Sequence, residues 1–350
     1  PALRSEADLN PYLSERWRRH IAEYGKLGRG PYAGRNTYPR FQPFLARRDS
    51  FPPNGGPPGS DLDFMREQLL DRYDIEYGIL EPLMPSSLVR NLELGVAVSE
   101  TMGAALCSAI NDWQVAAFTS REKRLRASIQ IPFEDAKAAV AEIERRVANR
   151  DFAQIQLTSR STEPLGRPRY WPIFEAAVHY NLPIGLHIGG EAGHAPTASG
   201  WPSFYIEDHH GLMHSMQCQA TSMVLEGVFE RFPSLRIIMI EGGLAWLPVL
   251  GWRLDRHWEK MHGEVPHLKR PPSEYMRQNL WVSTQPMEEP EDPEDLRRVL
   301  SWIGWDRVLF ATDYPHWDFD DPRYAFPCRL SEAERRAIFR GNAEATYRFA

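Results

Sequence analysis

The chain has 350 residues, which is enough for about two average domains or for one long α/β barrel. Hydrophobic side chains make up 42% of it and charged side chains 25%, and these proportions exclude a chain that is disordered throughout. The 41 basic and 47 acidic residues leave a net charge of −6, which argues against a nucleic-acid-binding protein.

The chain shows no signal for a membrane or for secretion. No apolar run approaches the roughly 18 residues of a membrane-spanning helix. The polar N-terminal stretch PALRSEADLN does not resemble a signal peptide. Cys107, Cys218 and Cys328 are far apart and odd in number, which favours free thiols and a cytoplasmic location.

The first 60 residues are predicted to form an irregular excursion from the main body. They are rich in Arg, Tyr and Pro, and they end in the run FPPNGGPPG at residues 51–59. Proline and glycine in this run disfavour a helix. Phe41, Phe44 and Leu45 lie among these residues, and they favour packing of the segment against the rest of the protein.

From residue 75 onward, short apolar runs alternate with amphipathic segments. Runs rich in Val, Ile and Leu, without strict alternation of polar and apolar residues, indicate parallel strands that are covered on both faces. We predict strands over residues 75–80, 125–131, 153–158, 184–188, 235–240, 280–283 and 308–311. Helices are predicted over 134–150, around 171–180 and around 216–232, the last two ending next to a proline.

This alternation predicts a parallel sheet, and the expected fold is α/β, a (β/α)8 TIM barrel. A barrel of this kind needs eight strands, whereas the sequence shows seven, because residues 1–59 contain no run typical of a buried strand. The first strand therefore lies upstream of Pro1, is missing, or has escaped recognition. We expect residues 1–350 to form a single barrel domain, with the excursion at 1–60.

Three of the predicted strands end in side chains that bind metal ions. His187 ends one strand, Glu241 follows another and Asp313 follows the last. Because the active site of a parallel barrel lies at the carboxyl ends of its strands, these residues are expected to converge. Each of them alone is common in a purely structural role. Together they predict a metal site, and imidazole with carboxylates suits Zn²⁺, Fe²⁺ or Mn²⁺.

Further histidines are predicted at the same end of the barrel. His209, His210 and His214 open a helix, and the last two are four residues apart, so they can share one helix face. For at least one of these three, a solvent-facing position is the alternative. His316 lies three residues after the strand-end aspartate, close enough to face the same cavity, and His194 lies in a loop that can reach a substrate.

Four longer stretches carry a resemblance to a known family: SDLDFMREQLLDRYDIEYG, GLHIGG, ERFPSLRIIMIEGGLAWLPVLGWRLDR and LFATDYPHWD. Together they resemble the amidohydrolase-related family that includes aminocarboxymuconate-semialdehyde decarboxylase and the resorcylate-type decarboxylases. The family implies a (β/α)8 barrel with a divalent metal, held by a His-x-His-type motif on the first strand, a histidine on the fifth and an aspartate on the eighth. By motif, His187 matches the fifth-strand ligand and Asp313 the eighth-strand ligand.

Two features depart from the family pattern. No His-x-His or Asp-x-His motif occurs near the start, in agreement with the missing first strand, and a barrel without that strand would be open and lack one or two metal ligands. The decarboxylases carry a histidine on the sixth strand, where this chain has Glu241, a carboxylate that can bridge two cations. A subgroup with this glutamate is similar to a di-iron thioester hydrolase, so the resemblance favours hydrolysis with one or two metal ions.

The leading hypothesis is a metal-dependent hydrolase that cleaves an amide, ester or thioester with metal-activated water. His187, Glu241 and Asp313 are expected to bind the metal. Asp313 is also expected to accept the proton of the water, and His209 or His316 to protonate the leaving group. We expect a small apolar or aromatic substrate, a homodimer, and candidate lids at residues 51–59 and 194–205.

Two alternatives stay open. One is the non-oxidative decarboxylation of an aromatic or unsaturated carboxylic acid, for which Arg47, Arg48 or Arg169 is a candidate to hold the substrate carboxylate. The other is a catalytically inactive barrel that serves as a binding or scaffold subunit, and the missing first-strand motif is its only support.

Overall fold

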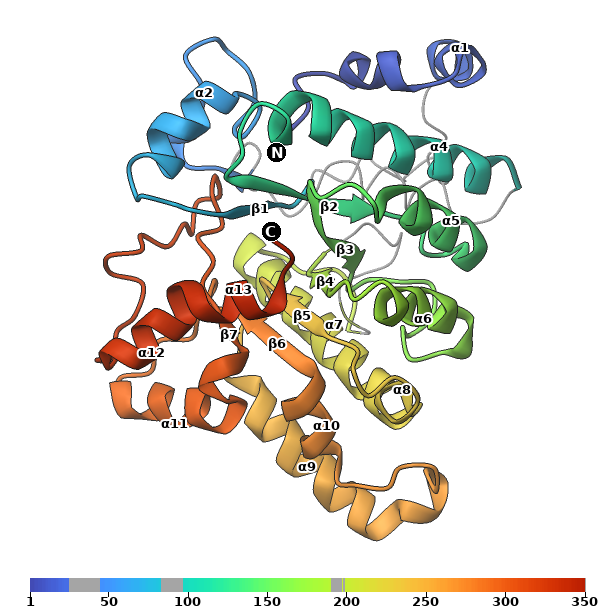
Figure 1. The fold of residues 1–350 in the computed structure, drawn as a ribbon. Coiled ribbons are helices and arrows are strands. Elements are labelled where there is room, and N and C mark those ends of the chain that lie inside the picture. Colours follow the sequence, from blue (N-terminus) through green and yellow to red (C-terminus); the bar gives the residue numbers. More distant parts are fainter. Residues whose placement is uncertain (25–44, 83–96, 190–196, 198, 350) are drawn as a thin grey trace.

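The centre of the fold is a curled sheet of parallel strands (Figure 1). The computed structural model describes residues 1–24, 45–82, 97–189, 197 and 199–349. Within them lie β1 (Gly78–Leu80), β2 (Leu125–Gln130), β3 (Phe152–Thr158), β4 (Ile184–His187), β5 (Ile237–Ile240), β6 (Leu280–Ser283) and β7 (Val308–Leu309). Their order in the sheet is their order in the sequence, and β1 and β7 are its edges. The predicted α/β barrel architecture is confirmed, with seven strands at nearly the predicted positions.

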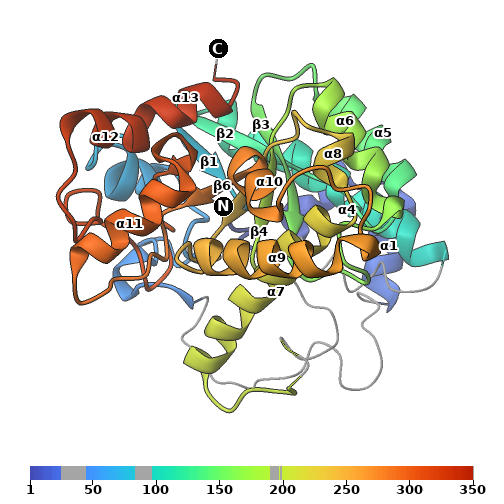
Figure 2. The ribbon, with the colours of Figure 1, turned by 90° about the horizontal axis from the view of Figure 1, so that it is seen from below.

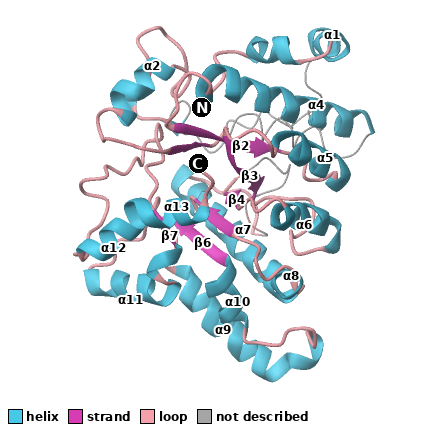
Figure 3. Ribbon diagram, in the orientation of Figure 1, coloured by secondary structure: helices cyan, strands magenta, loops and turns pink. Residues whose placement is uncertain are grey.

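Helices return the chain between successive strands and surround the sheet (Figure 3), as parallel pairing requires. They are α4 (Ala97–Gln114), α5 (Ala136–Arg146), α6 (Trp171–His179), α7 (Tyr205–Leu225), α8 (Val228–Arg231), α9 (Trp246–Met261), α10 (Pro272–Asn279) and α11 (Pro293–Ile303), followed after β7 by α12 (Glu332–Arg336) and α13 (Asn342–Thr346). The first part of α7 projects from the body (Figure 2). In the described part of the chain, no helix is long and apolar enough to cross a bilayer.

The segment before the sheet is more regular than its composition predicts. A 3-10 helix (Glu6–Tyr12) and α1 (Glu15–Tyr24) precede the short α2 (Leu62–Met65). Leu9, Leu13 and Trp17 are buried in one apolar cluster with residues of α4. Leu9 lies in the 3-10 helix, Leu13 directly follows it and Trp17 lies in α1, so both helices contribute to this cluster. The prediction of an irregular excursion is wrong for residues 6–24, because the many charged residues between these positions conceal the pattern.

The two faces of the sheet differ in chemistry. Outward-facing residues such as Ile129, Ile155 and Leu186 are buried in the main apolar core against the helices. On the inner face of the curled sheet, the side chains of β2 and β3 are polar and those of β5–β7 are apolar. The inward residues are Ser128 and Gln130 on β2, Gln154 and Gln156 on β3, and Ile238, Trp281 and Leu309 on β5–β7, and all are buried. Strands with alternating faces thus place polar groups beneath the carboxyl edge of β1–β4.

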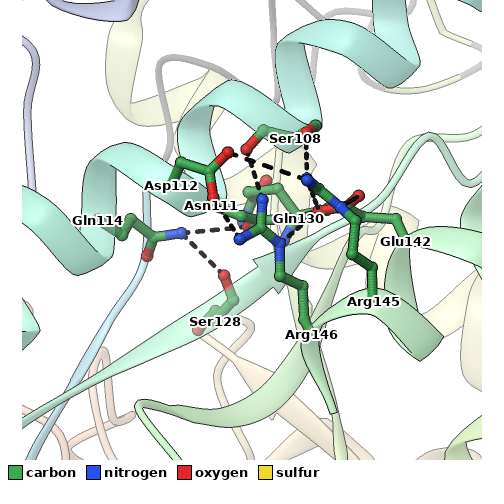
Figure 4. Close-up of polar contacts among 9 residues, drawn as sticks. All are labelled: Ser108, Asn111, Asp112, Gln114, Ser128, Gln130, Glu142, Arg145 and Arg146. Carbon is green, nitrogen blue, oxygen red and sulfur yellow. Dashed lines mark hydrogen bonds and ion pairs between the residues drawn. The ribbon is translucent and has the colours of Figure 1, made fainter. Parts of the chain in front are cut away.

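A buried polar network joins α4, α5 and β2 (Figure 4). The side-chain amide of Asn111 donates to the Gln130 carbonyl at 2.9 Å and to Glu142 Oε1 at 2.8 Å. The Gln130 N–H donates in turn to Asn111 Oδ1 at 2.9 Å. Because the ladder with β1 ends at Ala127, Asn111 satisfies strand groups that would otherwise be buried without partners.

Residues 45–50 dock against the loop that follows β7. The Arg47 N–H donates to the Pro315 carbonyl at 3.1 Å, and the Trp317 N–H donates to the Leu45 carbonyl at 2.8 Å. The Arg47 guanidinium also lies 4.7 Å from the ring centroid of Phe319. These contacts join the N-terminal segment to the loop that carries the predicted catalytic aspartate.

Candidate metal centre

The residues predicted at the strand ends meet at the carboxyl edge of the sheet. His187 is the last residue of β4 and Glu241 the first after β5, and both are buried. Their side chains approach closely, with His187 Nε2 2.6 Å from Glu241 Oε2. One potential ligand atom from each of Glu241, Asp313 and His316 lies within 4.8 Å of the other two. Two ligands of one ion can be at most about 4.2 Å apart with bonds of about 2.1 Å, so small side-chain shifts suffice for a shared cation.

The imidazole of His187 is held in one orientation. Its Nδ1 lies 2.5 Å from the carbonyl oxygen of Ile188, and because a carbonyl only accepts, Nδ1 is the donor. Nε2 is therefore the nitrogen that faces Glu241. Metal-binding histidines are commonly oriented in this way, with one nitrogen donating to a backbone carbonyl and the other left for the ion.

His316 and Asp313 form a second close pair. Nδ1 of His316 is 2.9 Å from both carboxylate oxygens of Asp313 and 3.8 Å from Oε1 of Glu241. A turn stabilises the pair, since the His316 N–H donates to the Asp313 carbonyl at 2.8 Å. His316 therefore lies between the two acids, although the sequence indicates only that it is near one of them.

Both acids occupy an unusual backbone conformation. The φ angle is 63° at Glu241 and 54° at Asp313, in the left-handed region that costs a non-glycine residue about 1–2 kcal/mol. The Glu241 N–H is held by Ser283 Oγ at 3.0 Å. Strain of this kind is concentrated at functional sites, where the surrounding structure maintains it.

Burial and mutual charge change the acidity of these groups. Burial and then the negative charge of Glu241 raise the pKa of Asp313 to about 7. Burial lowers the pKa of His316, but the Asp313 carboxylate outweighs it and raises that pKa to about 9. Burial opposes ionisation of Glu241, yet the charge of His187 keeps its pKa below the ordinary value. The centre is thus a place where positive charge stabilises two neighbouring carboxylates.

The residues present fit a divalent cation. Among the described residues, Oε2 of Glu241 is buried and accepts no hydrogen bond of regular geometry, and its close neighbour is His187 Nε2 at 2.6 Å. A buried carboxylate oxygen without a partner is costly, and a metal bond would satisfy it. The donor set of carboxylate oxygens and imidazole nitrogens suits Mn²⁺, Zn²⁺ or Fe²⁺.

A further acid at this edge was missed from the sequence. Glu81 directly follows β1 and accepts hydrogen bonds from Ser128 Oγ at 3.2 Å and from the Gln154 amide. Its Oε2 is buried and has no hydrogen-bond partner among the residues that the structure describes. Burial raises its pKa to about 7, and it interacts electrostatically with His187. The strand-end rule that identifies the other residues would have identified Glu81 as well.

The remaining predicted histidines lie on or near α7. His209 borders the centre, with Nε2 3.7 Å from Asp318 Oδ2. His210 and His214 share one helix face, with ring centroids 4.9 Å apart, but both are exposed. His194 lies outside the described residues.

Two of the three arginines named for a substrate carboxylate already have acidic partners. Arg169 pairs with Glu134 at 3.3 Å and Glu163 at 2.7 Å. Arg47 pairs with Asp49, and the adjacent Arg48 is exposed. Nothing in their contacts directs them to the metal centre.

Comparison with known proteins identifies a family and several related enzymes, decarboxylases among them. A family model described as amidohydrolase matches residues 17–349. The gamma-resorcylate decarboxylase of Polaromonas sp. is 26% identical over 294 residues, which are 81% of this chain and 86% of that protein. The enzyme of the same name from Rhodococcus jostii is 25% identical over 83% of this chain and 92% of its own length.

A solved structure agrees with these relatives. It is a dihydroxybenzoic acid decarboxylase from Polaromonas sp. with bound manganese and the inhibitor 2-nitroresorcinol. It is 25% identical, has a TM-score of 0.63, and the match covers 83% of this chain and 86% of that one.

These relatives correct the predicted reaction. The hypothesis of acyl-bond hydrolysis is wrong, since the related enzymes are decarboxylases. That hypothesis depended on Glu241 as a carboxylate that can bridge two cations, but its close contact with His187 is equally compatible with a single cation. A glutamate in place of a histidine on one strand therefore does not decide the reaction class. Because the family model spans nearly the whole chain and the fold agrees with it, this chain belongs to the amidohydrolase family of enzymes.

Proposed function

We propose that this protein is a non-oxidative decarboxylase of small aromatic carboxylic acids that uses a divalent metal. The observation that carries the proposal is similarity over more than four fifths of the chain to gamma-resorcylate decarboxylases. The cluster of Glu241, Asp313, His316 and His187 at the sheet edge supports it. Mn²⁺ is the first candidate metal, because it is bound in the related dihydroxybenzoic acid decarboxylase.

The reaction needs a proton donor and a fixed carboxylate. The ring carbon that loses the carboxylate gains a proton, and the electrons of the broken carbon–carbon bond return to the ring as carbon dioxide leaves. His187 and Glu241 would hold the metal together with Asp313. A bound divalent ion supplies electrostatic stabilisation to anionic oxygens of the substrate.

Asp313 is the residue we assign to proton transfer. Its carboxyl group is partly buried at the rim of the sheet, and His316 Nδ1 lies 2.9 Å from both of its oxygens. His316 can therefore return a proton to the carboxylate after each turnover. His209, which borders the centre, is placed to contact the substrate rather than to donate to a leaving group, because decarboxylation has no amine or alcohol leaving group.

The experiment measures products with a defined metal. Purified protein is reconstituted with Mn²⁺ and incubated with 2,6-dihydroxybenzoate and other hydroxybenzoates. We expect equimolar release of carbon dioxide and the decarboxylated phenol. A metal-loaded protein that releases no carbon dioxide from any of them would contradict the proposal. Retention of less than about a tenth of an equivalent of metal would instead favour the inactive scaffold. The predicted homodimer and cytoplasmic location stay predictions, the first of which sedimentation analysis checks.

A further inference from the structure

Three aromatic rings form a cluster beside the metal centre. Tyr205 and His209 come from the first two turns of α7, and Trp317 from the loop after β7. Ring centroids are 5.7 Å apart for Tyr205 and His209, 6.2 Å for Tyr205 and Trp317, and 6.1 Å for His209 and Trp317. The rings are tilted or edge-on to one another, the arrangement that aromatic pairs prefer.

The ring cluster is fixed in place and borders the metal centre. The indole N–H of Trp317 donates to the Tyr205 hydroxyl at 3.1 Å. Tyr205 interacts electrostatically with Asp313 and Glu241, and Glu241 with His209. The Trp317 side of the cluster is open, since this residue is 43% exposed. An aromatic substrate ring held at the metal centre would therefore contact the ring cluster.

Asp318 lies next to the ring cluster and carries a carboxylate oxygen that can accept a hydrogen bond. Its Oδ2 is buried and has no hydrogen-bond partner within the described part of the chain. Nε2 of His209 is 3.7 Å away, too far for a direct hydrogen bond. The Asp318 carbonyl accepts from the Gln285 side chain at 2.9 Å, so the loop that presents the carboxylate is anchored to the loop after β6.

We propose that Asp318 and the ring cluster of Tyr205, His209 and Trp317 determine substrate specificity. Asp318 Oδ2 accepts a hydrogen bond from a hydroxyl or amino group on the substrate ring, while Trp317 and Tyr205 contact the ring. The inference rests on the proposed decarboxylase function for the identity of the ring. The inference follows from a buried acceptor that has no donor among the described residues. A site of this kind discriminates against an analogue without the donor far more strongly than against one of different size.

The test measures binding, so that it does not depend on turnover. Protein loaded with Mn²⁺ is titrated calorimetrically with monohydroxybenzoates and with the matching methoxybenzoates, which lack the donor. We expect wild type to bind one hydroxy compound at least about tenfold more tightly than its methoxy partner. Asp318→Ala should abolish this preference and leave the Kd of the methoxy compound within about twofold.

Two further variants separate a specificity role from a structural one. Asp318→Asn retains a neutral acceptor oxygen and should restore part of the preference. Asp321→Ala is the matched control, because Asp321 lies on the same loop but pairs with Arg323 and Tyr73, and it should keep the full preference. Equal weakening of both ligands in Asp318→Ala would mean that Asp318 only positions the loop, and this would overturn the inference.

The remaining outcomes separate this inference from the proposed function. Wild type without any preference, or an equal preference in wild type and Asp318→Ala, overturns the inference and fits a water between His209 and Asp318. A preference that depends on Asp318 in a protein that releases no carbon dioxide supports the inference and refutes decarboxylation. Carbon dioxide release without the preference supports decarboxylation and overturns the inference. A protein that binds none of the benzoates also overturns the inference.

Discussion

The side chain of Gln154 occupies the position inside the barrel where a side chain on residue 185 would lie. A Cβ atom on Gly185 would lie 2.6 Å from the side-chain amide nitrogen of Gln154 and 2.8 Å from Ile240 Cδ1. The same amide donates to Glu81 at the end of β1, and Gly185 is two residues before His187. The absence of a side chain at residue 185 thus lets the amide of Gln154 reach across to Glu81 beneath the metal centre.

We expect Gly185→Ala to destabilise the protein, because the added methyl group must displace a buried amide. The free energy of unfolding should fall by about 1–3 kcal/mol, measured by urea denaturation. Gly263→Ala is the control, since a Cβ there meets nothing within 4 Å. Equal unfolding midpoints for wild type and Gly185→Ala would show that the space is not filled as described.

We expect Asp313→Asn to lose decarboxylation by a factor of at least about 100, because the amide cannot deliver the proton. The circular dichroism spectrum and the melting temperature should change little, since the amide is close to isosteric. Asp321→Asn, on the same loop and paired with Arg323, should stay active. Unchanged turnover in Asp313→Asn would refute its assignment.

Glu241→Gln should weaken metal binding by about tenfold or more, because it removes the charge 2.6 Å from His187 Nε2. Manganese content after dialysis against a metal buffer, measured by plasma mass spectrometry, checks this. If the variant keeps full metal but loses activity, Glu241 positions other groups instead of binding the ion.

Glu122 is expected to make stability depend on pH. Hydrogen bonds from Arg124 and Arg66, at 3.0 and 2.8 Å, lower its pKa from 4.5 to about 2. Because the folded-state pKa is the lower one, the stabilisation is present above about pH 4.5 and is lost as the pH falls towards 2. Glu122→Gln should cost about 1–2 kcal/mol at neutral pH.

That difference between wild type and Glu122→Gln should shrink as the pH falls from about 5 towards about 2, in urea titrations at each pH. The exposed Glu67 provides a control, because Glu67→Gln should show no such convergence. A difference independent of pH would mean that the ionised form of Glu122 does not stabilise the fold.

Local sequence patterns were sufficient for the sheet and for three residues of the centre. The runs that form β4–β6 are mainly apolar and buried on both faces, so their composition identifies them, whereas β2 and β3 also carry buried glutamines. His187, Glu241 and Asp313 follow from the same pattern, since parallel strands bring their carboxyl ends together whatever the loops do. The helices over residues 6–24 were missed because their apolar stripe is narrow and lies among charged residues.

Only the tertiary structure decided which side chains face one another across the strand ends. His187 contacts Glu241, His316 lies between two acids, and Asp318 approaches His209. The spacing of these residues in the sequence does not indicate how their side chains are oriented. Such contacts depend on loop conformation, including the left-handed backbone at Glu241 and Asp313 that the surrounding structure imposes. The sequence by itself determined which chemical groups lie at the rim of the barrel. The packing of loops that are distant in the sequence determined the distances between these groups, and hence which of them can act together.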